Sequence, residues 1–298
     1  MEWSSLKQVE TFLVNSFVLE GSGGNPAGVV LNAEHLSCAE RLQIAQDVGF
    51  SETAFVTRDK EVDFELTFYT TTEEVDFCGH ATLAAFSVMF EQGMINAGKY
   101  VQRTKAGILK VHIETNGQVV MQQRLPDFLG SFSYQVISPL IGLGEDVLAA
   151  TSLPIEVVTT GLADMIVPVP SGYLDKVKLN EDLMSEFCKK HNLVGAHVFE
   201  LNDSRSNYTA SCRNFAPLFG IPEESATGSA SGALACYLTK HINSDSNTTI
   251  DYLFEQGRAM ECASEISATI KLDNGQVSEV KVGGYAKVFD KQAVALET

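Results

Sequence analysis

The chain contains two similar helix starts, and this repetition restricts its fold more than any other feature. "FCGHATLAAF" (77–86) and "ATGSASGALACYL" (226–238) each run from a glycine into a helix of small residues. Two Asn-Gly turn signals, "IETNGQVV" (113–120) and "IKLDNGQVS" (270–278), lie at a similar offset. The stretches 42–56 and 183–201 both have the pattern of a helix followed by a strand. Because the three pairs occur in the same order, the sequence predicts two homologous halves, the first ending near Pro126 and the second beginning by Pro154.

Each half is predicted to be a sheet around a buried helix. Short runs rich in Val, Phe, Thr and Ile, such as "VDFELTFYT" (62–70), indicate strands. "GHATLAAFSVMFEQ" (79–92) and "GSASGALACYLTKH" (228–241) are apolar on nearly every face, as buried helices are. The expected fold class is therefore α+β, with two homologous domains, each a curled, mostly antiparallel, barrel-like sheet around a central helix. The last stretch is expected to return to the first domain, which gives domain limits of 1–127 with 286–298, and 128–285.

Composition restricts the partners and the compartment. The formal net charge of -17 disfavours nucleic acids and anionic membranes, which attract basic surfaces. The N-terminus lacks signal-peptide features and no apolar run reaches the length of a membrane span, so a cytoplasmic protein is expected. The six cysteines form no CxxC pair, which indicates reduced thiols rather than a disulfide framework. Beyond Cys78, we expect these cysteines to be buried apolar residues: Cys38, Cys188, Cys212, Cys236 and Cys262.

The two glycine-led helix starts are candidate anion sites. A helix N-terminus carries unpaired N–H donors and a partial positive charge, which suit a substrate carboxylate. Gly79 and Gly228 would let a ligand approach the backbone closely, and polar residues follow both of them, His80 and Ser229. The alternative is that both glycines only allow tight packing of helix against sheet. We expect the two helix starts to face one cleft between the domains.

Glu52 is the candidate acid. It lies in "GFSETAFV" (49–56) at a strand start, so it is either an exposed strand-end residue or a partly buried acid whose pKa is raised by desolvation. Phe50 and Phe55 are expected to wall it. When Phe55 is set against Phe199, the second half has Ala196 where the first has Glu52. A single acid suits a reaction in which one group removes a proton and returns it to another carbon on the same face.

Five segments together resemble the PhzF-like (phenazine-biosynthesis F type) isomerase family, within the diaminopimelate-epimerase fold. They are "GNPAGVVL" (24–31), "SETAFV" (51–56), "CGHATLAA" (78–85), "RNFAPLFGIPEESATGSASGAL" (213–234) and "GGYA" (283–286). The resemblance covers nearly the whole chain. It implies an active site in the interdomain cleft, no cofactor or metal, and a proton-transfer isomerisation of a small carboxylic acid, which in the well-characterised type is a cyclic amino-hydroxy acid. It also implies a possible homodimer.

The resemblance implies a catalytic set of Glu52, His80, Glu224 and Ser229. Glu52 matches the family's catalytic glutamate, and His80 matches the histidine beside the substrate. The residues expected to bind substrate are Asn25, Gly79, His80, Thr227, Gly228 and Ser229. Where the family pattern is Asp-Pro, this chain has Glu224-Ser225, so the carboxylate has a longer arm and the rigid proline is lost. That departure leaves the substrate open.

Four other interpretations of the sequence have different requirements. "GSGGNPAG" (21–28) fails as a dinucleotide fingerprint, because Pro26 and then a strand follow it; it is interpreted as a glycine loop with Asn25 in a turn. No metal is expected, since Cys78 and His80 should point different ways. A two-base racemase would need a thiol at both helix starts, and Cys78 occupies the first such place but Thr227 the second. An inactive binding or scaffold protein with this fold stays open as an alternative.

Overall fold

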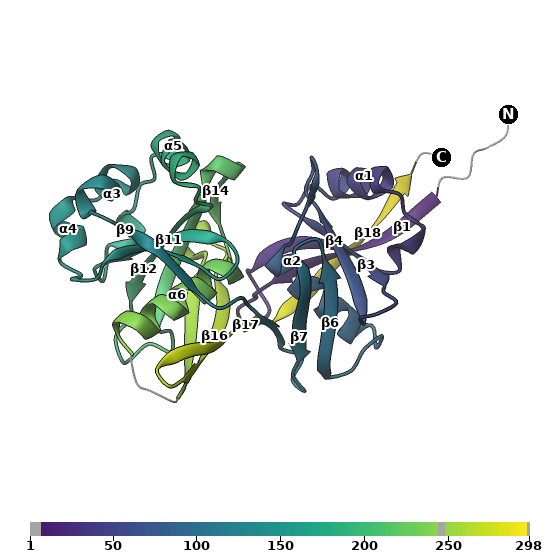
Figure 1. Cartoon of the computed structure of the whole chain (residues 1–298). Coiled ribbons are helices and arrows are strands. Elements are labelled where there is room, and N and C mark those ends of the chain that lie inside the picture. Colours follow the sequence, from purple (N-terminus) through teal and green to yellow (C-terminus); the bar gives the residue numbers. More distant parts are fainter. Residues whose placement is uncertain (1–6, 244–247, 297–298) are drawn as a thin grey trace. The chain divides into compact units, whose positions relative to one another are not determined.

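The computed structural model describes residues 7–243 and 248–296, and the chain divides into two compact units (Figure 1). Unit 1 comprises Met1–Met121 and Gly283–Thr298, and unit 2 comprises Gln122–Val282. Each unit combines a curled sheet with helices, which confirms the predicted α+β class.

The sheet of unit 1 has the strand order β18–β1–β2–β3–β4–β6–β7–β8, and β5 lies against β4. The pairs β2–β3 and β4–β6 are parallel and the others are antiparallel. The return of the last strand, β18, to pair with β1 is as expected. The elements of unit 1 are β1 (Lys7–Ser16), β2 (Asn25–Val30), η1 (Ala33–His35), α1 (Cys38–Val48), β3 (Thr53–Arg58), β4 (Phe64–Tyr69), β5 (Glu74–Val75), α2 (Gly79–Glu91), β6 (Gly98–Thr104), β7 (Gly107–Ile113), β8 (Val119–Gln122) and β18 (Ala286–Leu296).

The sheet of unit 2 has the order β9–β10–β11–β12–β13–β15–β16, and β14 lies against β13. The pairs β11–β12 and β13–β15 are parallel. Its elements are β9 (Asp127–Phe132), α3 (Tyr134–Ile141), α4 (Glu145–Ala149), β10 (Ile155–Thr159), β11 (Ala163–Val169), η2 (Leu174–Lys176), α5 (Glu181–His191), β12 (Gly195–Leu201), β13 (Ala210–Ala216), η3 (Pro217–Phe219), β14 (Ile221–Glu224), α6 (Gly228–His241), β15 (Thr249–Gln256), η4 (Arg258–Met260), β16 (Ser264–Asp273) and β17 (Gln276–Gly284).

The two units repeat one topology. In each, an outer helix (α1 or α5) connects two parallel strands, and the central helix (α2 or α6) connects the next parallel pair. A short antiparallel strand, β5 or β14, precedes each central helix. The helix starts at Gly79 and Gly228 are as predicted. The duplication inferred from the sequence is therefore present in the fold.

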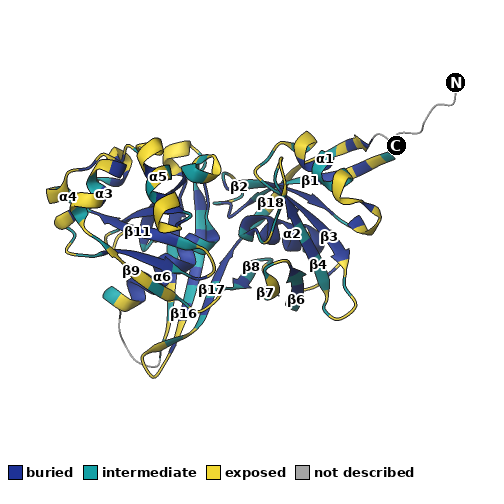
Figure 2. Cartoon of the chain, turned by 45° about the horizontal axis from the view of Figure 1, so that its top comes forward, coloured by how far each residue is buried: buried dark blue, intermediate teal, exposed yellow. Residues whose placement is uncertain are grey.

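The central helices are buried because they are apolar on nearly every side. From His80 to Met89 every residue of α2 is buried, and so is every residue of α6 from Ala230 to Thr239 (Figure 2). The outer helices α1, α3, α4 and α5 each carry an exposed face. α1 begins with a capping box, in which the Ser37 hydroxyl accepts from the Glu40 N–H and the Glu40 carboxylate accepts from the Ser37 N–H.

The faces of each sheet follow from strand alternation. In unit 2, one face packs on α3, α4 and α5 through residues such as Met165, Val198 and Phe215, and the other faces α6, where the Phe199 ring contacts Tyr237. In unit 1, Phe55 and Tyr69 pack with Ile44 of α1. The opposite face of the unit 1 sheet contacts α2.

Turn chemistry agrees with the sequence. Asn274 and Gly275 both have positive φ, 52° and 75°, as a type I′ turn between β16 and β17 requires. Gly117 also has positive φ, 85°, in the loop that joins β7 to β8.

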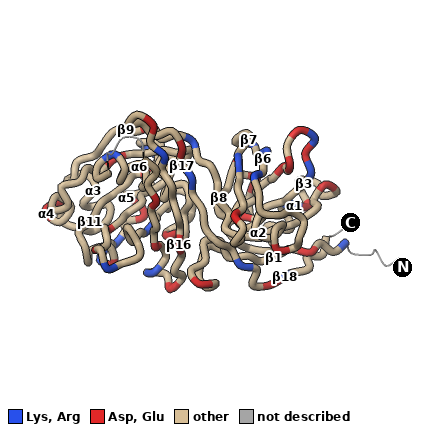
Figure 3. The backbone as a smooth tube through the Cα atoms, turned by 90° about the horizontal axis from the view of Figure 1, so that it is seen from below, with Lys and Arg blue, Asp and Glu red and all other residues tan. Residues whose placement is uncertain are grey.

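Charged residues of both signs occur along both units. Figure 3 shows acidic and basic residues distributed over the strands and loops of both units. Cys188, Cys212 and Cys236 are buried as expected, but the prediction was wrong for Cys38, which is exposed at the start of α1, and for the half-buried Cys262. Among the described residues, no helix combines the length and the apolar composition needed to cross a membrane.

Candidate functional site

Glu52 and His80 meet at the start of α2. Glu52 lies one residue before β3, and His80 is the second residue of α2. Glu52 Oε2 is 3.3 Å from His80 Nε2, and the two side chains are only 16% and 6% exposed. A mostly buried carboxylate beside an imidazole is an arrangement that can give and take protons.

Ser16 and Asn25 support this first turn of α2. The Ser16 hydroxyl donates a hydrogen bond to the carbonyl oxygen of His80 at 2.7 Å. Asn25 pairs with Ser16 in the β1–β2 ladder and is buried. The expectation that Asn25 lies in a turn was wrong: the glycine loop ends at Gly24, and Asn25 is the first residue of β2. Ser16 could not be identified from the sequence, because its role depends on the position at which β1 ends.

Neighbouring atoms do not crowd Gly79 at the start of α2. A Cβ added there would meet only the Phe77 ring, at 3.9 Å. Its backbone does not have the positive φ that would require glycine. Neither a positive φ nor crowding of an added Cβ therefore requires glycine at position 79.

Cys78 lies beside Glu52 and His80. Its Sγ lies 3.4 Å from His80 Nδ1, so the expectation that these side chains point different ways was wrong. The extended backbone of Cys78, with φ -142° and ψ 118°, turns its thiol towards the following helical turn. One ligand atom from each of Glu52, Cys78 and His80 lies within 4.8 Å of the others, and this set could hold a metal ion. Thiolate, imidazole and carboxylate are the ligands that zinc accepts.

The expected aromatic walls of Glu52 are placed differently. Phe55 lies on the α1 face of the sheet, where its ring contacts Tyr69 and the Arg41 guanidinium. Phe50 contacts Phe289 of β18. The prediction that Phe55 walls Glu52 was wrong, because Glu52 reaches His80 on the opposite, α2 face.

The structural repeat corrects the expected equivalence of Phe55 with Phe199. Ala54 pairs with Phe68, which pairs with Val75, four residues before Gly79. In unit 2, His197 pairs with Asn214, which pairs with Glu224, four residues before Gly228. Ala54 thus corresponds to His197, and Glu52 corresponds to Gly195 rather than Ala196. The conclusion that the acid is not duplicated stands.

A second group of polar residues surrounds the start of α6. Glu224 ends β14, and its carboxylate accepts a short hydrogen bond from the hydroxyl of Thr227, the residue before the helix. Gln256 joins these parts: its side-chain N–H group donates to the Glu224 carbonyl oxygen at 2.7 Å, and its oxygen accepts from the Thr227 N–H. Gln256 is fully buried at the end of β15 and was not identified from the sequence.

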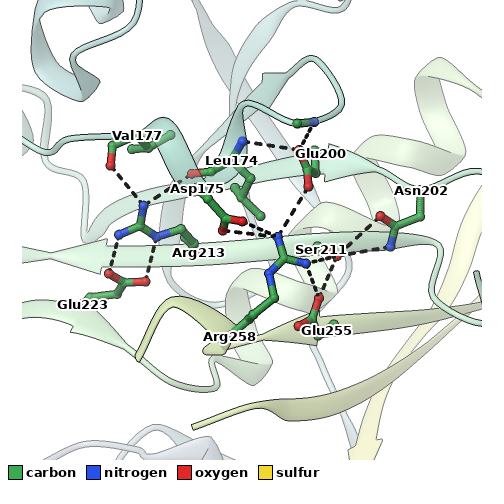
Figure 4. Close-up of polar contacts among 11 residues, drawn as sticks. Leu174, Asp175, Val177, Glu200, Asn202, Ser211, Arg213, Glu223, Glu255 and Arg258 are labelled. Atoms are coloured by element: carbon green, nitrogen blue, oxygen red, sulfur yellow. Dashed lines mark hydrogen bonds and ion pairs between the residues drawn. The ribbon is translucent and has the colours of Figure 1, made fainter. Parts of the chain in front are cut away.

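An ion pair on the other face fixes β14. Arg213 and Glu223 form two hydrogen bonds of 2.8 and 2.7 Å, and Arg213 also donates to the carbonyl oxygens of Leu174 and Val177 (Figure 4). Because successive strand residues point to opposite faces, this pairing of Glu223 leaves Glu224 for the α6 face. The pair anchors the strand immediately before the Glu224-Ser225 step, where the family's proline is missing.

Ser229 and Gly228 form the first turn of α6. The carbonyl oxygen of Ser229 accepts from the Thr160 hydroxyl at 3.3 Å. The half-buried Ser229 hydroxyl makes no hydrogen bond within the part of the chain that the structure describes. It is therefore available to a ligand at the helix N-terminus.

Three buried polar residues, Asp164, His197 and Asn214, lie on the α6 face of unit 2. His197 Nδ1 is 3.0 Å from Asn214 Oδ1, and burial lowers the pKa of His197 to about 4. Burial raises the pKa of Asp164 to about 7, and the charge of Glu224 adds to that increase. The sequence analysis missed all three, because an isolated Asp or His within an apolar strand gives no indication of what it faces.

Comparison with known proteins identifies the family of the chain. A family model described as phenazine biosynthesis-like protein matches residues 14–292. An uncharacterized isomerase of Clostridium acetobutylicum is 30% identical over 98% of this chain and 99% of its own length. The trans-2,3-dihydro-3-hydroxyanthranilate isomerase of Pseudomonas chlororaphis is 26% identical over 95% and 98% of the two chains. The crystal structure of a PhzF-family phenazine biosynthesis protein from Bacillus anthracis covers 97% of this chain and 100% of its own, with a TM-score of 0.89 and 27% identity. The chain therefore belongs to the phenazine biosynthesis-like (PhzC-PhzF) protein family.

Proposed function

We propose that this protein is a cofactor-independent isomerase that moves a proton within a small carboxylic acid, with Glu52 as the general acid/base. The observation that carries the proposal is the contact between Glu52 and His80 at the first turn of α2, with both side chains largely buried. The relatives named as isomerases support the class of reaction. A cyclic amino or hydroxy acid is the proposed substrate class.

One residue, Glu52, both removes and returns a proton. The Glu52 carboxylate accepts a proton from a carbon next to an unsaturated system, and the electron pair of that C–H bond delocalises into the system. The proton of the neutral Glu52 exchanges with solvent, the carboxyl group then delivers a proton to another carbon, and the double bond shifts. No proton or electron is lost, so Glu52 needs no partner acid.

The other residues hold the substrate in this proposal. His80 and Glu224 contact its polar groups, and Ser229 with the N–H groups of α6 binds its carboxylate. Asn25, Gly79, Thr227 and Gly228 line the binding surfaces. His80 is held in place by Cys78 at Nδ1 and by Ser16 at its carbonyl oxygen, so its ring is oriented before substrate arrives.

The first substrate to test is trans-2,3-dihydro-3-hydroxyanthranilate, because a 26% identical relative is named as its isomerase. A panel of cyclic amino and hydroxy acids follows it. Isomerisation of any of them by the purified chain supports the proposal. Inversion of a stereocentre without double-bond migration would favour a racemase instead, and no proton exchange with any of them would favour a binding or scaffold protein.

Removal of metal ions should leave the rate unchanged, because the proposed chemistry uses only protein side chains. Added Zn²⁺ should inhibit, since Glu52, Cys78 and His80 can ligate it and the ion would occupy the acid/base. The measurement is the initial rate after dialysis against a chelator, with and without zinc. Activity that is lost on dialysis and restored by zinc would contradict the cofactor-free mechanism.

Ser229→Ala should weaken substrate binding by about 1 kcal/mol, the usual net contribution of one hydrogen bond. The loss is small because the helix N–H groups remain as the main donors. This corresponds to an increase in Kd of about fivefold, with little change in kcat. Titration of the substrate into the variant measures it, and a loss greater than about 100-fold would show that the hydroxyl, rather than the backbone, is the main anchor.

A further inference from the structure

Asp164 is an acid in an unusual place. It is 1% exposed, and its Oδ1 has no hydrogen-bond partner among residues 7–243 and 248–296. A buried carboxylate without donors is costly as an anion, and a carboxyl group meets that cost by keeping its proton. The proposed mechanism assigns no role to this residue.

Among the residues that the structure describes, no cation pairs with Asp164 or offsets a charge on it. His197, on the same face, donates from Nδ1 to Asn214 and is neutral, and its Nε2 is also buried without a partner among the described residues. Lys240 and His241 pair with Glu156, at 2.7 and 2.8 Å, at the other end of α6. Arg213 pairs with Glu223 on the opposite face of the sheet. The Cys188 thiol of α5, which packs on that opposite face, is also near Asp164.

Asp164 also lies near the proposed carboxylate-binding end of α6. It pairs directly with Val158 of β10, and Thr160, two residues further on, bonds to the Ser229 carbonyl oxygen. On its other side it pairs with Gly195, the position that corresponds to Glu52 in unit 1. The charge of Glu224 is close enough to affect the proton on Asp164.

We propose that Asp164 is a positioning residue for the substrate-binding group at the start of α6, and that it acts by keeping its proton. As a neutral acid it keeps negative charge away from the Glu224 carboxylate and from the helix N-terminus that receives the substrate carboxylate. The part of this proposal that concerns catalysis rests on the proposed function, whereas the proton on Asp164 does not.

The pH dependence follows from the sign of the shift. Because burial raises the pKa of Asp164 to about 7, the group is neutral below that pH and becomes an anion above it. The groups that face it are Glu224, which is acidic, and His197, which carries no charge in this range. Ionisation therefore adds a negative charge and should weaken binding of an anionic substrate as the pH rises.

Infrared spectroscopy tests the proton without any substrate. In the full chain with isotope-labelled aspartate, the C=O band of a protonated aspartate should be present at about pH 6 and lost as the pH rises through about 7. Asp164→Asn should lack the band. Glu224→Gln should move the titration to lower pH because it removes the neighbouring charge, whereas Glu261→Gln, at an exposed position, should not.

Absence of a protonated aspartate band at about pH 6, or an unchanged titration in Glu224→Gln, would overturn the assignment. The second measurement does not require Asp164→Asn to fold. If the band behaves as expected while the protein moves no proton in any acid tested, the proposed function fails and the proton on Asp164 stands.

Kinetics test the positioning role. The probe is trans-2,3-dihydro-3-hydroxyanthranilate, and kcat/KM is measured for Asp164→Asn and for the wild type. The value for the variant divided by that for the wild type should rise with pH above about 7, because the KM of the wild type increases. Asparagine has the shape of the neutral acid and cannot ionise. A ratio that stays constant from about pH 6 to about pH 9 would show that Asp164 acts only through packing.

Discussion

Glu52→Gln should give a folded protein that binds its substrate and yet turns it over at least about 100-fold more slowly. Glutamine has nearly the same shape as glutamate, so the contact with His80 Nε2 can be kept, but an amide cannot accept the proton that the reaction moves. The loss should appear in kcat, since the group acts in the transition state rather than in binding. Steady-state kinetics and a binding titration separate the two effects.

Glu65→Gln is a matched control for this change. Glu65 is a half-buried carboxylate of β4 in the same unit, and its carboxylate lies near the Thr57 hydroxyl rather than His80. It should retain the wild-type rate. A Glu52→Gln variant with near wild-type kcat would exclude Glu52 as the acid/base and direct attention to Cys78 and His80, which lie 3.4 Å apart.

Gly195→Ala should destabilise the fold by about 3 kcal/mol, at the upper end of what overpacking usually costs. The added Cβ would overlap the carbonyl oxygen of Phe215 and crowd the Ala216 backbone, and backbone atoms within a sheet cannot move away as a flexible side chain can. The effect is steric, because Gly195 does not have positive φ. Denaturant unfolding monitored by circular dichroism measures it.

Gly144→Ala provides the comparison. Gly144 has φ -65° and a Cβ added there would meet only Val147, at 3.9 Å, so this change should cost less than about 1 kcal/mol. Equal stabilities of the two variants would contradict the close approach of β12 and β13 at Gly195.

The features that repeat in the sequence were the predictable ones. The starts of α2 and α6, the Asn-Gly turns and the helix-to-strand connections depend on local signals, such as glycine at a helix start and apolar composition all round a helix. These signals do not depend on distant parts of the chain. The duplication was therefore visible before the fold, and the fold class followed from it.

Predictions that depended on side-chain direction were less accurate. Setting Phe55 against Phe199 matched two aromatic residues by type, but one faces α1 and the other faces α6. A shift of one residue in a strand moves every side chain to the opposite face, so the sequence match paired Glu52 with the wrong position. Cys78 was placed wrongly for a similar reason, since its direction depends on the backbone angles of the residue before a helix.

Polar residues brought together by the sheet could not be found from one sequence. Gln256 contacts Glu224 and Thr227 only because β15 lies parallel to β13. Asp164 and His197 share a face only because β11 and β12 are parallel and in register. The roles given to Glu52, His80, Glu224 and Ser229 stay predictions of the family resemblance, as does the homodimer. The domain limits and the cytoplasmic location stay predictions of the sequence.

The proposed mechanism requires Glu52 to move a proton between carbon and solvent-exchangeable positions without a cofactor. The most direct measurement is the deuterium content, by mass spectrometry, of trans-2,3-dihydro-3-hydroxyanthranilate and its product after incubation in D₂O with metal-free wild type and with Glu52→Gln. We expect one carbon-bound deuterium with the wild type and almost none with the variant. Equal deuterium incorporation by the two proteins would contradict it.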